Sequence, residues 1–411
     1  MKQNIKKQEI VVFILCYLAY AAAYLGRANF AIALPKMINE ANWSRTVLGS
    51  VAGAFFWTYA VGQLVNGFLG DRIAPRILVG IGLAVSALCN LFIYLFPHLK
   101  AMGILWLING FALSALWGPI IRTISLWFKP EKQSRVALYL STSMVLGYFL
   151  AWGGLGSLIA YKSWRLAFLI PGLVGLSVAI LWVLFLPQGE SGTSQGVTPK
   201  KDKKLSLGLN WGITAFVLLI ISTIAQGIVK DSVSLWGPTL LTEYAGLSVE
   251  KAAKGALLIP LATLLGMFLA GFSEKVTNSD DSLSFAFLMV LCGFSLAAVR
   301  FVPTSNGLIV AVLISIATAF IYGANTVLTT FIPLRLGKGS RVSSIAGFLD
   351  FFSYVGSALS GMISGLLIEE SGWNQALTMW LGLAVLGAIT AVGLRKRLKS
   401  EETNLRETQS L

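Results

Sequence analysis

The stretch YAAAYLGRANFAIALP, residues 20–35, is an apolar run that carries one arginine, Arg27, in its interior. A cation at the centre of a bilayer costs about 3 kcal/mol on insertion scales, so an arginine there indicates a specific task. A second stretch, KDSVSLWGP at 230–238, lies about half a chain later, and its lone cation, Lys230, precedes a proline by the same interval as Arg27 does. The repetition predicts a membrane protein of two related halves, whose buried cations face a shared anion-binding site.

Composition agrees with a membrane protein. The 411-residue chain is 56% hydrophobic and has a mean hydropathy of +0.75. Soluble domains contain roughly 45–50% apolar residues, so this chain is expected to be surrounded by a lipid bilayer. The net charge of +14 comes from lysines and arginines in short clusters between apolar runs. That arrangement is a topology signal of membrane proteins, and no nucleic-acid partner is expected.

Apolar runs of about 20 residues predict transmembrane helices. We expect an all-α integral membrane fold with twelve spans, near residues 9–34, 47–69, 76–96, 102–127, 136–160, 165–186, 210–240, 252–272, 283–301, 307–334, 342–367 and 374–395. The longest polar stretch is rich in glycine, serine and lysine and predicts a flexible linker between six spans and six. The expected organisation is an N-terminal six-helix bundle at 1–187, a cytoplasmic linker at 188–206, a C-terminal six-helix bundle at 207–398 and a cytoplasmic tail at 399–411.

Lysine and arginine residues set the predicted orientation. They are frequent before the first span, after the even-numbered spans and after the last span, and they are rarer in the odd-numbered connections. By the positive-inside rule, both termini and the linker are expected in the cytoplasm, with the protein in the cytoplasmic (inner) membrane. Because each half supplies the interface of the other, we expect a monomer.

The residues that support catalysis or metal binding in other proteins are sparse. Three cysteines, Cys16, Cys89 and Cys292, lie inside apolar runs without metal-ligand spacing and are expected to be buried packing residues. The only histidine, His98, falls in a predicted connection. The sequence therefore predicts neither an enzyme nor a metal site, and no cofactor is expected.

The sequence GFLGDRIAPR, residues 67–76, forms a predicted loop after the second span. It resembles the G-x-x-x-D-R-x-x-x-R signature of the major facilitator superfamily, whose fold has twelve transmembrane helices in two six-helix bundles. The resemblance implies that Asp71 controls a gate at the cytoplasmic side, and that Arg72 and Arg76 hold that side in place. In such a fold the substrate binds near the membrane midplane, between the halves.

Within that superfamily the chain resembles the organophosphate:phosphate antiporters, the family of the glycerol-3-phosphate and hexose-phosphate transporters. The stretches that carry the resemblance are YAAAYLGRANFAIALP at 20–35, YAVGQLVNGFLGDRIAPR at 59–76, ALWGPIIRTISLWF at 115–128, KDSVSLWGPTLL at 230–241 and, more weakly, AGFLDFFSYVGSALSG at 346–361. Together they extend over most of the chain. The resemblance implies exchange of a small organic phosphate for inorganic phosphate.

Carried over by position, the resemblance assigns an anion-binding site. Arg27 matches the phosphate-binding arginine of the family's first helix, and Lys230 matches the partner arginine of the seventh. Tyr20, Tyr24 and Tyr59 match tyrosines that line the same cavity. The first two lie one turn apart on a face that Arg27 shares, where they either contact the anion or serve as packing residues.

Three positions depart from the family pattern. Lys230 offers a compact charge where an arginine would offer a bidentate fork. A family lysine of the second helix falls at Gln63, and a histidine that some members carry in the fifth falls at Met144. The predicted site keeps two cations but has fewer supporting donors.

Three further charged residues lie within the spans. Arg122 is near the predicted cytoplasmic end of span four, where a structural hydrogen bond is an alternative to substrate contact. Asp231 follows Lys230 directly; successive residues do not share a helix face, so Asp231 need not neutralise the lysine, and it is a candidate coupling group or charge partner. Asp350 is the one acid well inside a late span, so it is either a coupling group or a charge partner of Lys230.

The leading hypothesis is an antiporter that exchanges a small organic phosphate for inorganic phosphate by alternating access. Few titratable groups lie within the spans, which favours exchange over proton coupling. One alternative is a proton- or sodium-coupled symporter of organic anions such as hexuronates, a group that the stretches RANFAIALP and IIRTISLWF also resemble. Another is a sugar-phosphate sensor of transporter fold, which binds its ligand without exchange.

Overall fold

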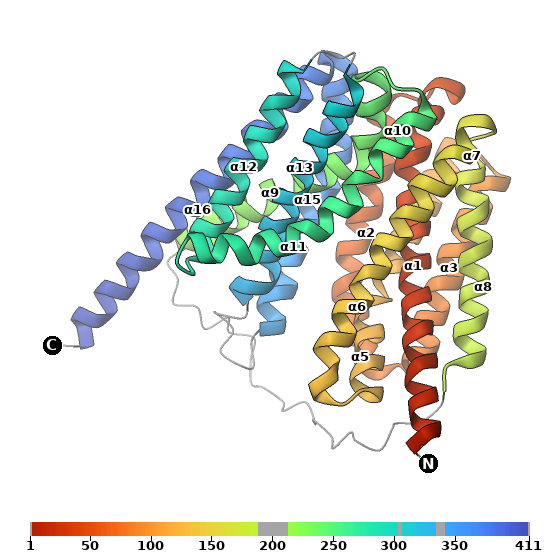
Figure 1. The fold of residues 1–411 in the computed structure, drawn as a ribbon, viewed down its shortest axis with the longest axis horizontal. Helices are drawn as coiled ribbons and strands as arrows, with labels where there is room; N and C mark the ends of the chain where they lie inside the picture. Colours follow the sequence, from red (N-terminus) through yellow and green to blue (C-terminus); the bar gives the residue numbers. More distant parts are fainter. Residues whose placement is uncertain (1, 188–212, 303–305, 334–341, 410–411) are drawn as a thin grey trace.

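The protein is built from helices throughout the residues that a computed structural model describes, 2–187, 213–302, 306–333 and 342–409 (Figure 1). The predicted linker, 188–206, lies outside these residues. The helices before it are α1 (Lys2–Ala41), α2 (Arg45–Arg72), α3 (Pro75–Leu95), α4 (Leu99–Ser114), α5 (Trp117–Trp127), α6 (Pro130–Phe149), the π-helical turn η1 (Leu150–Leu155), α7 (Gly156–Tyr161) and α8 (Leu166–Phe185). Those after it are α9 (Ile213–Glu243), α10 (Val249–Ala256), α11 (Leu258–Val276), α12 (Asp281–Phe301), α13 (Gly307–Thr326), the π-helical turn η2 (Val327–Phe331), α15 (Val342–Ser371) and α16 (Trp373–Gln409).

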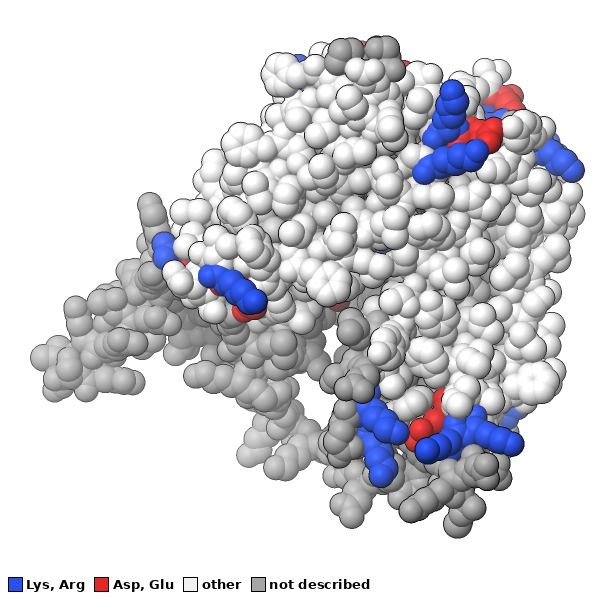
Figure 2. Space-filling view, viewed as in Figure 1, with Lys and Arg blue, Asp and Glu red and all other residues white. Residues whose placement is uncertain are grey.

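These helices form twelve segments that are long and apolar enough to cross a membrane, as the sequence predicted. Span four joins α4 to α5, span five joins α6, η1 and α7, and span eight joins α10 to α11. Figure 2 shows charged side chains toward the ends of the molecule and a wide uncharged belt between them. Such a belt is the surface that lipid covers, which confirms an all-α integral membrane fold.

Two spanning helices continue past an internal proline. The sequence placed the end of the first span at residue 34, but α1 continues to Ala41 with Pro35 inside the helix. The seventh span was predicted at 210–240, beyond Pro238, and α9 contains this proline and ends at Glu243. Proline removes one backbone donor, yet in lipid the chain has no water to replace the lost helical bonds, so the helix continues past it.

Two predicted non-helical segments are mostly helical. The motif at 67–76 was expected to be a loop, but α2 extends to Arg72 and only Ile73 and Ala74 separate it from α3. The predicted tail at 399–411 continues α16 as far as Gln409. Its lysine, glutamate and arginine residues are good helix formers, and no glycine or proline interrupts them.

Helices pack within each half and across the interface between the halves. In the N-terminal half α1 packs on α6 and α8, α2 on α4, and α3 on α4 and α8. In the C-terminal half α9 packs on α13, α15 and α16, and α12 on α13 and α16. The two halves meet where α2 packs on α15 and α1 on α9. Residues 225–241 of α9 are all buried, so this helix is central to the molecule.

The backbones of α2 and α15 touch at a set of glycines, which we name the glycine seam: Gly49 and Gly53 of α2, and Gly361 and Gly365 of α15. A Cβ atom on Gly49 would lie 2.1 Å from the carbonyl oxygen of Gly361, and one on Gly361 would lie 2.3 Å from that of Gly49. Neither distance is possible for a real side chain, so only glycine permits this approach. Small residues of this kind let membrane helices pack closely.

Polar contacts between the halves gather at one end of the molecule, which we name the closed end. Arg45 at the start of α2 forms a salt bridge with Glu243 at the end of α9, with Nη2 2.9 Å from Oε1. Across the same interface, Thr46 Oγ1 donates to Glu369 Oε2 at 2.6 Å. Within the C-terminal half, Trp373 Nε1 donates to Glu243 Oε2 at 3.1 Å and so holds the carboxylate of this salt bridge. Figure 1 shows the chain ends on the opposite side, where α16 and α12 lean away from α1. The halves therefore join at the closed end and diverge toward the termini.

Candidate anion-binding site

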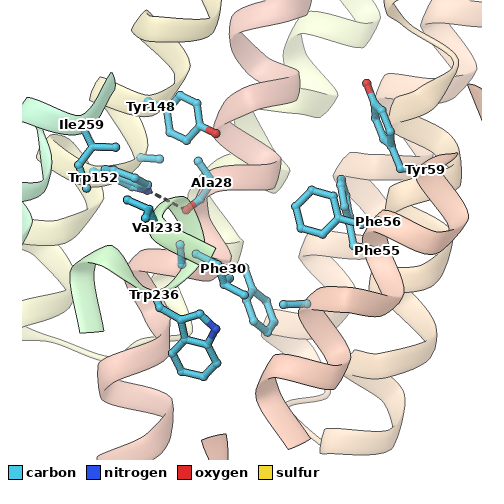
Figure 3. Packing of buried hydrophobic residues seen from close by; sticks show 14 of the residues in the cluster. Ala28, Phe30, Phe55, Phe56, Tyr59, Tyr148, Trp152, Val233, Trp236 and Ile259 are labelled. Atoms are coloured by element: carbon cyan, nitrogen blue, oxygen red, sulfur yellow. Dashed lines mark hydrogen bonds between the residues drawn. The ribbon is translucent and has the colours of Figure 1, made fainter. Parts of the chain in front are cut away.

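Arg27 lies in the middle of α1, and side chains from three other elements hold the backbone on either side of it. Asn109 of α4 and Asn90 of α3 both donate from Nδ2 to the carbonyl oxygen of Gly26, at 3.1 Å and 3.4 Å. Trp152 of η1 donates from Nε1 to the carbonyl oxygen of Ala28 at 3.0 Å (Figure 3). These bonds fix the rotation of α1 about its axis and so direct Arg27 toward the interface of the halves.

The guanidinium group of Arg27 is surrounded by aromatic rings. Its Cζ atom lies 5.0–5.5 Å from the ring centres of Tyr24, Phe55, Phe56 and Tyr59. Cation–π attraction of about 0.5–2 kcal/mol per ring offsets part of the lost hydration, but a ring face accepts no strong hydrogen bond. No salt bridge of the described residues involves Arg27. Its planar set of N–H donors is therefore available to an anion.

Lys230 of α9 is already paired. Its Nζ atom lies 3.4 Å from Oδ2 of Asp231, and the two residues are only 8% and 3% exposed. Of the two candidate charge partners, Asp231 is the one in contact with Lys230. Ser357 of α15 donates a hydrogen bond to the same Oδ2 atom, which draws the carboxylate to the side where the flexible lysine stem can reach it. Since an isolated buried charge is costly, the pair forms despite its unfavourable spacing on the helix.

Arg27 and Asp231, the ion-pair partner of Lys230, line the same cavity. The two cations lie close enough to repel one another. A narrow cavity of about 40 Å³, which we name the central cavity, is lined by Arg27, Tyr148, Asp231 and Ser234 among others. The wall thus combines residues of α1, α6 and α9, from both halves of the chain.

Aromatic residues extend the site to either side of these charges. The Lys230 Nζ atom lies 5.5 Å from the ring centre of Tyr354 and 6.0 Å from that of Tyr322. Tyr59 of α2 packs on Tyr354 of α15 with ring centres 4.8 Å apart, so it bridges the halves. Tyr20 packs on Tyr24, at 5.0 Å, one turn further from the closed end. Of the predicted tyrosines, Tyr24 and Tyr59 contact Arg27, whereas Tyr20 acts through a neighbour.

Arg122 is bound to backbone outside the central cavity. Its Nη1 atom donates to the carbonyl oxygens of Gly70 and Ile73, the latter at 3.2 Å. These carbonyls belong to the end of α2, where the last turn of a helix leaves acceptors unpaired. The geometry agrees with the structural alternative for Arg122. Gln63 lies one turn beyond Tyr59 on α2 and is half-buried, and no hydrogen bond of the described residues involves it.

The predicted gating residues lie at the junction of α2 and α3. The side chain of Asp71 lies outside the described residues. Arg72 is exposed, and Arg76 donates from Nε to the carbonyl oxygen of Val183 on α8 at 2.6 Å. Together with Arg122, the motif ties the end of α2 to α5 and the start of α3 to α8.

Asp350 of α15 is exposed, and the described ion pair of Lys230 is with Asp231. Asp350 exerts an attraction on Lys230 without forming a contact pair. No group of three His, Cys, Asp or Glu side chains able to hold a metal occurs among the described residues.

Comparison with known proteins identifies the fold family. The sequence model of the Major Facilitator Superfamily matches residues 16–361. The chain belongs to this superfamily. Members are membrane transporters, so the protein is a transporter and not an enzyme.

Two curated transporters and one solved structure are similar to this major facilitator along nearly its whole length. The glycerol-3-phosphate transporter of Bacillus subtilis (strain 168) is 26% identical over 416 residues, which cover 93% of this chain and 91% of that protein. A probable hexose phosphate transport protein of Chlamydia trachomatis is 23% identical over 425 residues, covering 95% and 91%. The crystal structure of the nucleoside transporter NupG superposes with a TM-score of 0.73 at 16% identity, covering 95% of this chain and 99% of that one. The structural likeness supports the fold alone.

Several residues of this transporter's site were missed by reasoning from the sequence. Tyr354 and Ser357 lie in the stretch at 346–361 that carries the weaker resemblance, but nothing local distinguishes them from packing residues. Asn90 and Asn109 could have been identified from the sequence, because an amide side chain inside an apolar span needs a hydrogen-bond partner. Both face the backbone of α1 beside Arg27.

Proposed function

We propose that the protein exchanges a small organic phosphate for inorganic phosphate, and that Arg27 is the principal anion-binding group. The observation that carries the proposal is a guanidinium group between the two halves with no acidic partner among the described residues. Arginine presents planar donors that match the oxygens of a phosphate in a bidentate arrangement. The similarity to transporters named for glycerol-3-phosphate and hexose phosphate supports the same substrate class.

Alternating access follows from the arrangement of the halves. An anion that enters between Arg27 and Lys230 relieves their repulsion and draws the N- and C-terminal halves together. Closure on the terminal side then competes with the salt bridge of Arg45 and Glu243 at the closed end. We place the protein in the inner membrane as a monomer, with both termini in the cytoplasm. In that orientation, this conformation opens toward the cytoplasm.

The test is uptake of radiolabelled phosphate by proteoliposomes. Vesicles loaded with phosphate are compared with empty vesicles, for the natural protein and for the variant Arg27→Gln. Exchange predicts uptake that requires internal phosphate, persists with a proton ionophore and is lost in the variant. The matched control is Arg300→Gln, because Arg300 is exposed and donates to Thr378 at the surface. Equal uptake into empty and loaded vesicles, or unchanged uptake by Arg27→Gln, would contradict the proposal.

One observation favours a second function, proton-coupled uptake of an organic anion. Asp231 lines the central cavity beside Lys230, so the proposed transport site contains a carboxyl group, the kind of side chain that proton-coupled transporters use. Uptake into empty vesicles that is driven by an inward proton gradient and abolished by an ionophore would favour this symport reading. The same vesicles separate the two functions, because only exchange needs an internal anion.

A further inference from the structure

Arg27 and Lys230 do not contribute two free positive charges to the region around the central cavity. Lys230 and Asp231 form a contact pair that is neutral as a unit. Arg27 is surrounded by aromatic rings, and no ion pair of the described residues involves it. Asp350, the next acid on the C-terminal side, adds negative rather than positive charge near Lys230. The site therefore offers at most one uncompensated positive charge, that of Arg27.

The carboxylate of Asp231 is held in place. It accepts a hydrogen bond from Ser357 of the neighbouring α15 and is paired with Lys230, and the residue is 3% exposed. The neighbouring residues of α9, 225–241, are buried as well. It also lines the same cavity as Arg27. An anion bound to Arg27 consequently meets a fixed negative charge across the cavity.

We propose that this transporter selects the singly charged form of its anionic substrate, and that Asp231 is the residue that sets this preference. The inference rests on the proposed substrate class and deepens it. A singly charged ester neutralises Arg27 and leaves the pair of Lys230 and Asp231 intact. A doubly charged ester places its second charge against Asp231, and like charges in a desolvated site are strongly unfavourable. The favoured ligands are a protonated phosphate ester or its sulfate analogue, which has the same shape.

Two isosteric esters test this selection. Glycerol 3-sulfate carries one charge, whereas glycerol 3-phosphate carries two at about pH 8, because the second pKa of a phosphate ester is about 6. Binding of each to the purified protein in detergent is measured by titration calorimetry at that pH. We expect the natural protein to bind the sulfate at least as tightly as the phosphate. Removing the fixed charge in Asp231→Asn is expected to shift the affinity ratio about ten-fold toward the phosphate, by loss of the like-charge contact.

Two further variants separate the charge from other effects. Asp231→Glu keeps a carboxylate and is expected to keep the natural preference. Glu40→Gln removes a negative charge from a surface pair with Lys36 and is expected to leave the ratio unchanged.

The inference is overturned if the natural protein prefers the doubly charged ester, or if Asp231→Asn leaves the ratio unchanged. If neither ester binds, this inference and the proposed substrate class both fail. If the esters bind with the expected selectivity but vesicles show no exchange, the inference stands and only the proposed function fails.

Discussion

Arg27 and Lys230 occupy matching places in the two halves of the transporter, on α1 and α9, yet their surroundings differ. Both lie at the same interval before a proline inside the helix, and both are flanked by aromatic rings. Arg27 has four rings and no acid, whereas Lys230 has Asp231 in contact. Repeated halves thus place two cations at one interface, and local substitutions give one of them a free charge and the other a compensated one.

The largest expected effect on exchange comes from a substitution of Arg27, the cation without an acidic partner. Arg27→Lys keeps the charge but loses the planar donors, so we expect phosphate exchange to fall about 100-fold. Its counterpart, Lys230→Arg, keeps a charge that can still pair with Asp231 and is expected to change exchange by less than about three-fold. Initial rates of exchange in proteoliposomes measure both. Equal losses in the two variants would show that the cations are equivalent.

A second prediction removes the compensated cation. Lys230→Gln leaves Asp231 as a buried unpaired charge, which costs about 3 kcal/mol. The melting temperature of the purified protein is expected to fall by about 5 °C. The double variant Lys230→Gln with Asp231→Asn is expected to recover most of this loss, because no charge remains unpaired. Failure of the second substitution to restore stability would contradict the ion pair.

A third prediction concerns the rings around Arg27. Phe56→Leu removes the ring closest to the guanidinium group, at 5.0 Å, and is expected to weaken phosphate binding about three-fold by loss of one cation–π contact. The control is Trp57→Leu, since the neighbouring Trp57 is 44% exposed on the outer surface. Competition binding with labelled phosphate measures both. A larger loss in Trp57→Leu would point to a general packing effect.

The smallest expected effect is at Ser357. Ser357→Ala removes the hydroxyl that holds the Asp231 carboxylate beside Lys230, so the ion pair is positioned less firmly. We expect exchange to decrease about two-fold, within the range of a single hydrogen bond. Ser360→Ala is the control, because Ser360 donates only to a backbone carbonyl on its own helix. If the exchange rate falls equally in both variants, Ser357 has no specific role in positioning Asp231.

Hydropathy made the spans predictable. Each apolar run is long enough to cross a bilayer regardless of its neighbours, and all twelve spans occur. The importance of Arg27 was predictable for a related reason, since a charge in an apolar run is costly wherever the helix packs. The continuation of α1 past Pro35 was not predicted, because it depends on the absence of water around the helix.

The pairing of charges required the tertiary structure. Asp231 turns toward Lys230 because Ser357 approaches from α15, about a third of the chain away, and no local pattern specifies that approach. Arg122 offered two roles in the sequence, and the carbonyls of Gly70 and Ile73 indicate the structural one. The glycine seam is equally hidden, because many of the 41 glycines lie in spans and only a few meet a backbone across the interface.

The glycine seam has a consequence for how easily the conformations interconvert. Where Gly49 meets Gly361, no side chains interlock, so separating α2 from α15 frees no rotamers and requires no repacking at that point. The balance between the two conformations is then decided by the few polar contacts of the closed end. Reversing a two-state population from 1:99 to 99:1 requires a ligand that binds one state about 10⁴-fold, or about 5.5 kcal/mol, more tightly than the other. An anion with that difference in affinity would be sufficient to set the direction in which such a molecule opens.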